Sequence, residues 1–219
     1  MTQNTSHAVM SQRSEPHDSL DFFPTPWWST RALCEWIGQN GAATFSGSVW
    51  EPACGAGDMA KPLAEYFGSV HASDIFNYGF GEVDDFLIPN DRRAGWVISN
   101  PPFRLAQQFV LTALERSDEG VAMLVRTAFL EGGARHRELF SPFPPSEILQ
   151  FVERVPMVKG RLDKSASTAT SYCWICWRHG ELKRESHFHW LAPCRKRLER
   201  PGDYPITPDE AGKFDEAGA

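Results

Sequence analysis

Ser48-Val49-Trp50-Glu51-Pro52-Ala53-Cys54-Gly55-Ala56-Gly57-Asp58 decides the fold of this 219-residue chain. Its first three residues are typical of a short buried strand, and the glycine pair after them allows a tight turn. Helical spacing of Met59, Leu63 and Phe67 follows, so the stretch predicts the strand, turn and helix that open a nucleotide-binding unit. Glu51 at the strand end would repel a pyrophosphate and attract an ammonium group. This favours a nucleoside that carries a cationic amino acid over a dinucleotide.

A second informative stretch is Asn100-Pro101-Pro102-Phe103, which follows the apolar run 95–99. Neither proline has an N–H for a sheet ladder, so the strand ends here. An amide side chain, two rigid carbonyls and an aromatic ring are left together at the carboxyl edge of the sheet. These groups can hold a planar amino group, with two acceptors for its hydrogens and a ring on which to stack. A proline-rich loop capped by Asn would have the same sequence, so this motif indicates a function only together with the motifs around it.

Acidic residues lie between these two stretches. Asp74 ends a strand predicted over 70–75 and comes 16 residues after Asp58, close to the offset of about 20 at which an acid holds ribose hydroxyls. Asp85 and Phe86 then offer a carboxylate and a ring for an adenine. A single acidic loop is usually just solvated, but the order and spacing of these stretches favour one shared ligand site.

Together these residues resemble S-adenosylmethionine-dependent DNA methyltransferases that act on the N6 amino group of adenine. The family's motifs are matched, in the γ-like order, at 22–26, 51–57, Asp74, Asp85-Phe86 and 100–103. The Phe form of the last motif is similar to that of type I modification subunits, and the small size is similar to that of methylases carried by phages. The resemblance covers roughly residues 20 to 178.

The resemblance implies S-adenosylmethionine as the cofactor and Asn100, Pro101, Pro102 and Phe103 as the catalytic residues. It also implies that the cofactor is bound by Asn100 and a set of residues at the other motifs: Phe23, Thr25, Pro26, Glu51, Ala53, Cys54, Gly55, Gly57, Asp74, Ile75, Asp85 and Phe86. The expected reaction is methyl transfer to the N6 amino group of an adenine flipped out of duplex DNA. Acceptors at Asn100 and Pro101 would aim the nitrogen lone pair at the methyl group, so that positioning rather than a strong base drives the reaction.

Two alternatives use the same residues. The 100–103 motif identifies a planar nitrogen but not the polymer that carries it, so an RNA adenine or a protein glutamine side chain remains open as the acceptor. A non-catalytic subunit that binds S-adenosylmethionine is the second alternative, although it would have no chemical reason to keep this motif. Only about 40 residues follow Trp177, which predicts a relaxed or short recognition site, or a partner that supplies recognition.

The remaining pattern predicts a doubly wound α/β domain. Helices are expected over 26–38 and 104–116, and further strands over 121–125, 148–155 and 172–177. The resemblance adds a Rossmann-like sheet of seven strands, mostly parallel with an antiparallel last strand, and helices on both faces. The expected organisation is a disordered tail at 1–19, a methyltransferase domain at 20–178, and a short, partly disordered extension at 179–219.

Cys173 and Cys176, with histidines after them, could suggest a zinc site. Residues three apart in a strand point to opposite faces, so these thiols could not share a metal and we predict none. The five cysteines are irregularly spaced, no apolar run is long enough to cross a membrane, and the N-terminus has no secretory pattern. We therefore expect a cytoplasmic protein without a membrane partner.

The net charge of −6 is unevenly distributed along the chain. Residues 1–100 carry 5 Lys/Arg against 12 Asp/Glu, whereas residues 101–200 carry 16 against 11. Basic residues of the second half are candidates for contacts with DNA phosphates: Arg126, Arg135, Arg137, Lys159, Arg161 and Lys164. Surface arginines can also simply make a protein soluble. Composition alone therefore does not favour phosphate binding over solubility as the role of these residues.

Overall fold

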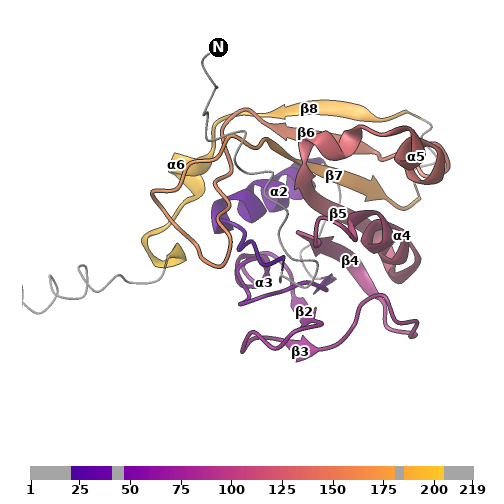
Figure 1. Cartoon of the computed structure of the whole chain (residues 1–219), viewed down its shortest axis with the longest axis horizontal. Coiled ribbons are helices and arrows are strands. Elements are labelled where there is room, and N and C mark those ends of the chain that lie inside the picture. The colour runs from indigo at the N-terminus through magenta and orange to yellow at the C-terminus, as the bar shows by residue number, and fades with distance from the viewer. Residues whose placement is uncertain (1–20, 41–46, 181–184, 205–219) are drawn as a thin grey trace, which may run out of the picture.

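The computed structural model describes residues 21–40, 47–180 and 185–204. Its strands are β1 (Ser48–Glu51), β2 (Ser69–Asp74), β3 (Glu82–Val83), β4 (Ala94–Ser99), β5 (Ser117–Arg126), β6 (Glu147–Phe151), β7 (Tyr172–Arg178) and β8 (His187–Leu191). They form one sheet in the order β3-β2-β1-β4-β5-β7-β6-β8 (Figure 1). The tail predicted at 1–19 and the end of the predicted extension, 205–219, lie outside the described residues.

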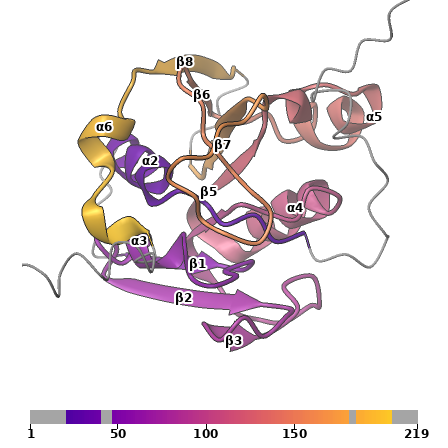
Figure 2. The ribbon, with the colours of Figure 1, turned by 60° about the vertical axis from the view of Figure 1, so that its left-hand side comes forward.

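Helices cover both faces of this sheet. They are α2 (Trp27–Asn40), α3 (Ala60–Leu63), α4 (Ala106–Arg116), α5 (Gly133–Arg135) and α6 (Arg195–Leu198), with the short helical turns η1 (Thr127–Leu130), η2 (His136–Phe140) and η3 (Pro201–Asp203). Figure 2 shows α2, α3 and α6 on one side of the sheet and α4 and α5 on the other. No helix within the described ranges has both the length and the apolar character needed to span a membrane.

The sheet is mostly parallel, as predicted. β1 pairs in parallel with β2 and with β4, and β4 pairs in parallel with β5. β7 inserts antiparallel between β5 and β6, and β8 adds a parallel edge strand to β6. The prediction of a Rossmann-like sheet with helices on both faces is therefore confirmed.

The predicted strand count and the position of the antiparallel strand are wrong. The sheet has eight strands where seven were predicted, and the antiparallel strand β7 is followed by β8. Residues 187–191 belong to the extension predicted at 179–219, but they form a strand that pairs along the whole of β6. The His189 ring lies 4.6 Å from that of Trp36, so a polar residue helps to hold this edge strand.

The helices begin close to the predicted residues but differ in length. α2 starts directly after Pro26, whose carbonyl accepts the backbone N–H and the hydroxyl of Ser29. The helix predicted over 59–67 is reduced to the four residues of α3, continued by turns. Pro62 lies in its first turn, where a missing N–H is tolerated, and beyond α3 the N–H groups of Glu65 and Tyr66 bond to residues three positions back, as in turns.

Two separate cores result from this layering. One lies under α2 and contains Trp28, Leu33 and Cys176, and the other lies under α4 and contains Val110 and Cys173. The two thiols of β7 thus lie on opposite faces of the sheet, as the strand period predicts.

The order of the strands also fixes where a ligand can bind. β1 lies between β2 and β4. The chain therefore passes from β1 to β2 on one side of β1 and later enters β4 on its other side. The crevice at the carboxyl ends of β1 and β4 is the usual ligand position in open α/β sheets. Glu51 ends β1 there, and Asn100 directly follows β4.

Candidate active site

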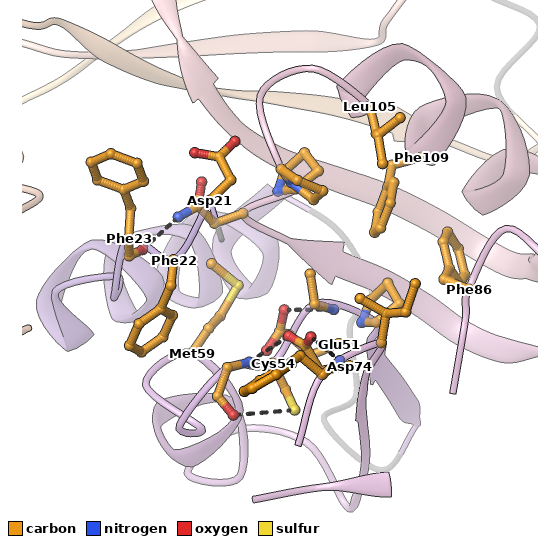
Figure 3. A pocket seen from close by; sticks show the side chains of 18 of the residues that line it. Asp21, Phe22, Phe23, Glu51, Cys54, Met59, Asp74, Phe86, Leu105 and Phe109 are labelled. Carbon is orange, nitrogen blue, oxygen red and sulfur yellow. Dashed lines mark hydrogen bonds between the residues drawn. The ribbon is translucent and has the colours of Figure 1, made fainter. Parts of the chain in front are cut away.

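A cavity of about 190 Å³ lies at the carboxyl ends of β1, β2 and β4 (Figure 3). The predicted cofactor-binding and catalytic residues that line it are Phe23, Thr25, Glu51, Ala53, Cys54, Gly55, Asp74, Ile75, Asp85, Phe86, Asn100, Pro101, Pro102 and Phe103. Pro26 and Gly57 are outside the lining, at the start of α2 and in the glycine turn. Five motifs that are far apart in the sequence thus meet at one cavity.

The glycine turn after β1 needs both of its glycines. Gly55 has a φ of 50° and Gly57 a φ of 85°, backbone conformations that strain other residues. A Cβ on Gly55 would lie 2.5 Å from the Phe22 ring, and a Cβ on Gly57 would lie 2.7 Å from the Phe80 ring. The turn is therefore both conformationally special and closely covered by aromatic side chains.

Glu51 is a buried carboxyl that lacks a full set of partners. Its Oε1 accepts the hydroxyl of Ser99 at 3.1 Å and the backbone N–H of Ala53 at 3.4 Å, whereas Oε2 is buried without a hydrogen-bond partner. Burial raises the pKa of Glu51 from 4.5 to about 8. A cation at Oε2 would supply the missing partner, because an opposite charge favours the ionised form.

The two predicted acids beyond β1 are held by backbone donors. Asp74 accepts the N–H of Gly55 at 2.9 Å and that of Phe76 at 3.0 Å, and burial raises its pKa. Asp85 accepts the N–H of Leu87 at 2.9 Å. Each carboxylate is thus fixed in orientation at the cavity wall.

Phe86 forms part of the cavity wall from within a core. Its ring is 1% exposed and packs edge-to-face on Trp50, with ring centres 5.0 Å apart. It also lies 5.1 Å from the Phe109 ring, on α4. The ring is therefore fixed in place by its neighbours on both sides.

Asn100 has one end of its amide fixed and the other unused. Its Nδ2 donates to the Phe23 carbonyl at 3.0 Å and to the Thr25 hydroxyl at 3.1 Å. A carbonyl can only accept, so the NH₂ group must face Phe23 and the amide orientation is determined. Oδ1 is then left buried without a partner. A buried acceptor without a donor is costly, and a ligand N–H would satisfy it.

Phe103 is held at the cavity by its backbone and its ring. Its N–H donates to the carboxylate of Asp21 at 2.7 Å, and its ring centre lies 5.2 Å from that of Phe23. The guanidinium of Arg126 lies over the ring at 3.9 Å. One candidate phosphate-binding residue thus reaches the site that the 100–103 motif forms.

Sequence reasoning missed several residues that line the cavity. Phe22, which belongs to the 22–26 motif but was not among the predicted site residues, stacks with Tyr78 with ring centres 4.6 Å apart beside the glycine turn. Asp58 lines the wall with a carboxyl whose pKa is raised by burial. Leu105 and Phe109 contribute from the helix after the motif. Their i, i+4 spacing on the first turns of α4 was a usable signal, since such residues share a helix face.

The other predicted phosphate-binding residues are more scattered. Arg135 is turned back on its own loop, donating to the carbonyls of Phe129 and Glu131 at 2.7 and 2.5 Å, and Arg161 pairs with Asp163 at 3.1 Å. The rest are exposed, Arg137 in η2 and Lys159 and Lys164 in the segment between β6 and β7. The 159–161 loop does approach the site, because the Gly160 N–H donates to the Phe22 carbonyl at 2.9 Å.

Solved structures with this fold were found, although no family model and no curated protein sequence matches the chain. A modification subunit of a putative type I restriction enzyme from Vibrio vulnificus YJ016 is 16% identical, covers 96% of this chain and 54% of its own, and has a TM-score of 0.55. A putative class I S-adenosylmethionine-dependent methyltransferase from Listeria monocytogenes is 12% identical, with coverages of 94% and 73% and a TM-score of 0.59. A putative RNA methyltransferase from Pyrococcus horikoshii is 17% identical, with coverages of 78% and 96% and a TM-score of 0.56.

This is the methyltransferase fold. The chain spans about half the length of the Vibrio modification subunit. At these identities the likeness extends to the fold, so the chemistry must be argued from the residues of the cavity themselves.

Proposed function

We propose that the chain transfers a methyl group from S-adenosylmethionine to the N6 amino group of adenine in DNA. The observation that carries this proposal is the buried, unpartnered Oδ1 of Asn100 at the end of β4. It is an acceptor whose direction is set by the contacts of Nδ2 with Phe23 and Thr25. An amino group is the complementary donor, and an exocyclic amine has two N–H groups to offer.

The residues of the cavity support S-adenosylmethionine as the cofactor. The unpartnered Oε2 of Glu51 suits the ammonium end of an amino acid, and the fixed carboxylates of Asp74 and Asp85 suit hydroxyl and amino groups of a nucleoside. These residues would therefore hold the amino-acid and the nucleoside parts of the cofactor. When bound, S-adenosylmethionine supplies a methyl group activated by its attachment to a sulfonium.

The roles proposed for the 100–103 motif follow from its geometry. Asn100 Oδ1 and the Pro101 carbonyl take one amino hydrogen each, which fixes the direction of the nitrogen lone pair. Pro102 stiffens the loop, and its carbonyl accepts the Leu105 N–H at 2.9 Å, which joins the motif to α4. Phe103 offers its ring to the base. Holding the two reactants in line supplies most of the acceleration, because the amine loses its proton only after it has been methylated.

DNA is the acceptor that the surroundings of the site favour. Arg126 places a cation directly over Phe103, and the basic half of the chain begins after Asn100. A modification subunit named for a restriction system and a putative RNA methyltransferase share this fold at similar TM-scores, so the proposal of DNA rests on the arginine at the site and the basic half of the chain. A target adenine has to leave the duplex before its amino group can reach a buried acceptor such as Asn100.

The test is incubation with labelled S-adenosylmethionine and separate DNA, RNA and protein acceptors, followed by analysis of the modified nucleosides or side chains. We expect N6-methyladenine in DNA. Label in RNA adenine or in glutamine would reassign the acceptor, and cofactor binding without any transfer would support a non-catalytic subunit.

The variant that tests the proposed catalytic role of the 100–103 motif is Asn100→Ala. It should reduce transfer to background while calorimetry still detects cofactor binding, because the unpartnered acceptor faces the amino group rather than the cofactor. Thr25→Val is a useful companion: it removes one contact of Nδ2 and keeps the other, so transfer should fall without being abolished. Loss of cofactor binding in Asn100→Ala would instead give Asn100 a role in binding the cofactor or in the structure of the site.

A further inference from the structure

A second groove begins beside the candidate active site. It is formed by the end of β5 with η1, by the end of β6 and the residues after it, and by β8, which is the edge of the sheet (Figure 1). Arg126 lines this groove and also lies over the Phe103 ring, which lines the cavity. Arg126 thus connects the groove to the cavity of the candidate active site.

The groove displays two large aromatic side chains. Phe188 is 49% exposed and Trp190 is 67% exposed, and their rings pack edge-to-face with centres 4.9 Å apart. They occupy alternate positions of β8 and so point to the same face of the strand. Leu191, on the opposite face, is buried in the core under α2. The aromatic pair therefore faces away from that core, into the groove.

The groove lining carries two arginines and two glutamates. Arg154 is exposed, and its Nη1 donates to the Ala169 carbonyl at 2.9 Å and to the Ser171 hydroxyl at 2.7 Å, which fixes it on the rim. Glu153 also lines the groove, but its carboxylate accepts the N–H groups of Cys194 and Arg195 at 2.5 and 2.7 Å. Glu131 is the other acid of the lining. Two guanidinium groups therefore line the groove, and backbone donors hold the carboxylate of Glu153.

We infer that this groove binds the DNA strand next to the target adenine, with Trp190 and Phe188 as a stacking platform and Arg126 and Arg154 at the phosphates. The inference rests on the proposed function and adds where the flanking nucleotides lie. Exposed aromatic rings interleaved with arginines are the usual means of holding unstacked nucleotides, since every base has a face on which to stack. Stacking of this kind does not depend on the sequence of the bases.

The inference is tested by fluorescence anisotropy with a labelled DNA duplex that contains one unpaired adenine. Wild-type protein is compared with Trp190→Ala, Trp190→Phe and Phe143→Ala. Phe143 is a matched control because its side chain is 46% exposed and it precedes β6, away from the groove lining. Cofactor binding, thermal unfolding and sedimentation are recorded for each variant.

We expect Trp190→Ala to weaken DNA binding about tenfold, as the loss of one stacked base does. Trp190→Phe should keep most of the affinity, Phe143→Ala all of it, and cofactor binding should be unchanged throughout. Wild-type affinity in Trp190→Ala would overturn the inference while leaving the proposed function in place. A change from dimer to monomer in that variant, with DNA binding intact, would overturn it in favour of an interface between copies. Failure of the proposed function is read separately, as absence of methyl transfer by the wild-type chain.

Discussion

Replacing Glu51 by Gln should abolish a proton release that accompanies cofactor binding. Burial raises the pKa of Glu51 to about 8, so at about pH 6.5 most of the free protein carries a proton on this carboxyl. An ammonium group next to the unpartnered Oε2 favours the ionised form. Binding should therefore release about one proton, since an α-amino group, with an ordinary pKa of about 8, keeps its charge at this pH.

Calorimetry in buffers of different ionisation enthalpy measures this release directly. For the wild-type protein, the dependence of the observed heat on the buffer should correspond to about one proton given up, and for Glu51→Gln to about none. The wild-type affinity should also rise about tenfold between about pH 6 and pH 7, whereas the affinity of the variant should stay level. A wild-type binding heat that does not depend on the buffer would refute the reasoning, because it would mean that Glu51 keeps one protonation state throughout.

The same carboxyl makes the free protein less stable as the pH rises. The folded-state pKa of Glu51 lies above its ordinary value of 4.5, so between about pH 4.5 and pH 8 the folded protein binds more protons than the unfolded chain. The free energy of unfolding should fall across this window by up to about 1.4 kcal/mol per pH unit. Urea unfolding at several pH values should show this slope in the wild type and a smaller one in Glu51→Gln.

Two further substitutions test the packing around the site. Gly55→Ala should reduce both stability and cofactor affinity, because its Cβ would lie 2.5 Å from the Phe22 ring at a φ of +50°. Gly79→Ala is the control, since Gly79 has a φ of +80° and no atom lies within 4 Å of the added Cβ. In urea unfolding this control should lose only about 1 kcal/mol through backbone strain. Arg31→Met should destabilise the fold by about 3–5 kcal/mol, because it leaves the buried Asp203 without its partner at 2.7 Å. The double change with Asp203→Leu should recover much of this loss, and an equally unstable double variant would contradict the explanation.

The order of the motifs predicts most of the candidate site. In an α/β sheet each strand ends at the same edge, so Glu51, Asp74 and Asn100 must meet wherever their strands are neighbours. That inference needs only the strand periodicity and the turn residues. The hydrogen-bond partners of Asn100 could not be predicted in this way. Its contact with the Phe23 carbonyl spans 77 residues and depends on how the N-terminal segment crosses the sheet.

The parts that sequence reasoning missed are those where tertiary contacts override composition. β8 contains two histidines and reads as polar, yet pairing with β6 and packing against Trp36 make it a strand. Asp203 reads as part of an acidic tail, yet it is 4% exposed because Arg31 pairs with it inside the protein. A buried arginine has no signature in the sequence that distinguishes it from a surface one.

The separation of Cys173 and Cys176 onto opposite faces of β7 provides a built-in probe of local opening. All five cysteines are free and buried, and burial raises the pKa of each thiol, so in the closed protein they react slowly with alkylating reagents. Cys34, Cys176 and Cys194 belong to the layer under α2, Cys173 to the layer under α4, and Cys54 to the glycine turn. The order in which these thiols become labelled would therefore show which layer opens first, without any label having to be introduced.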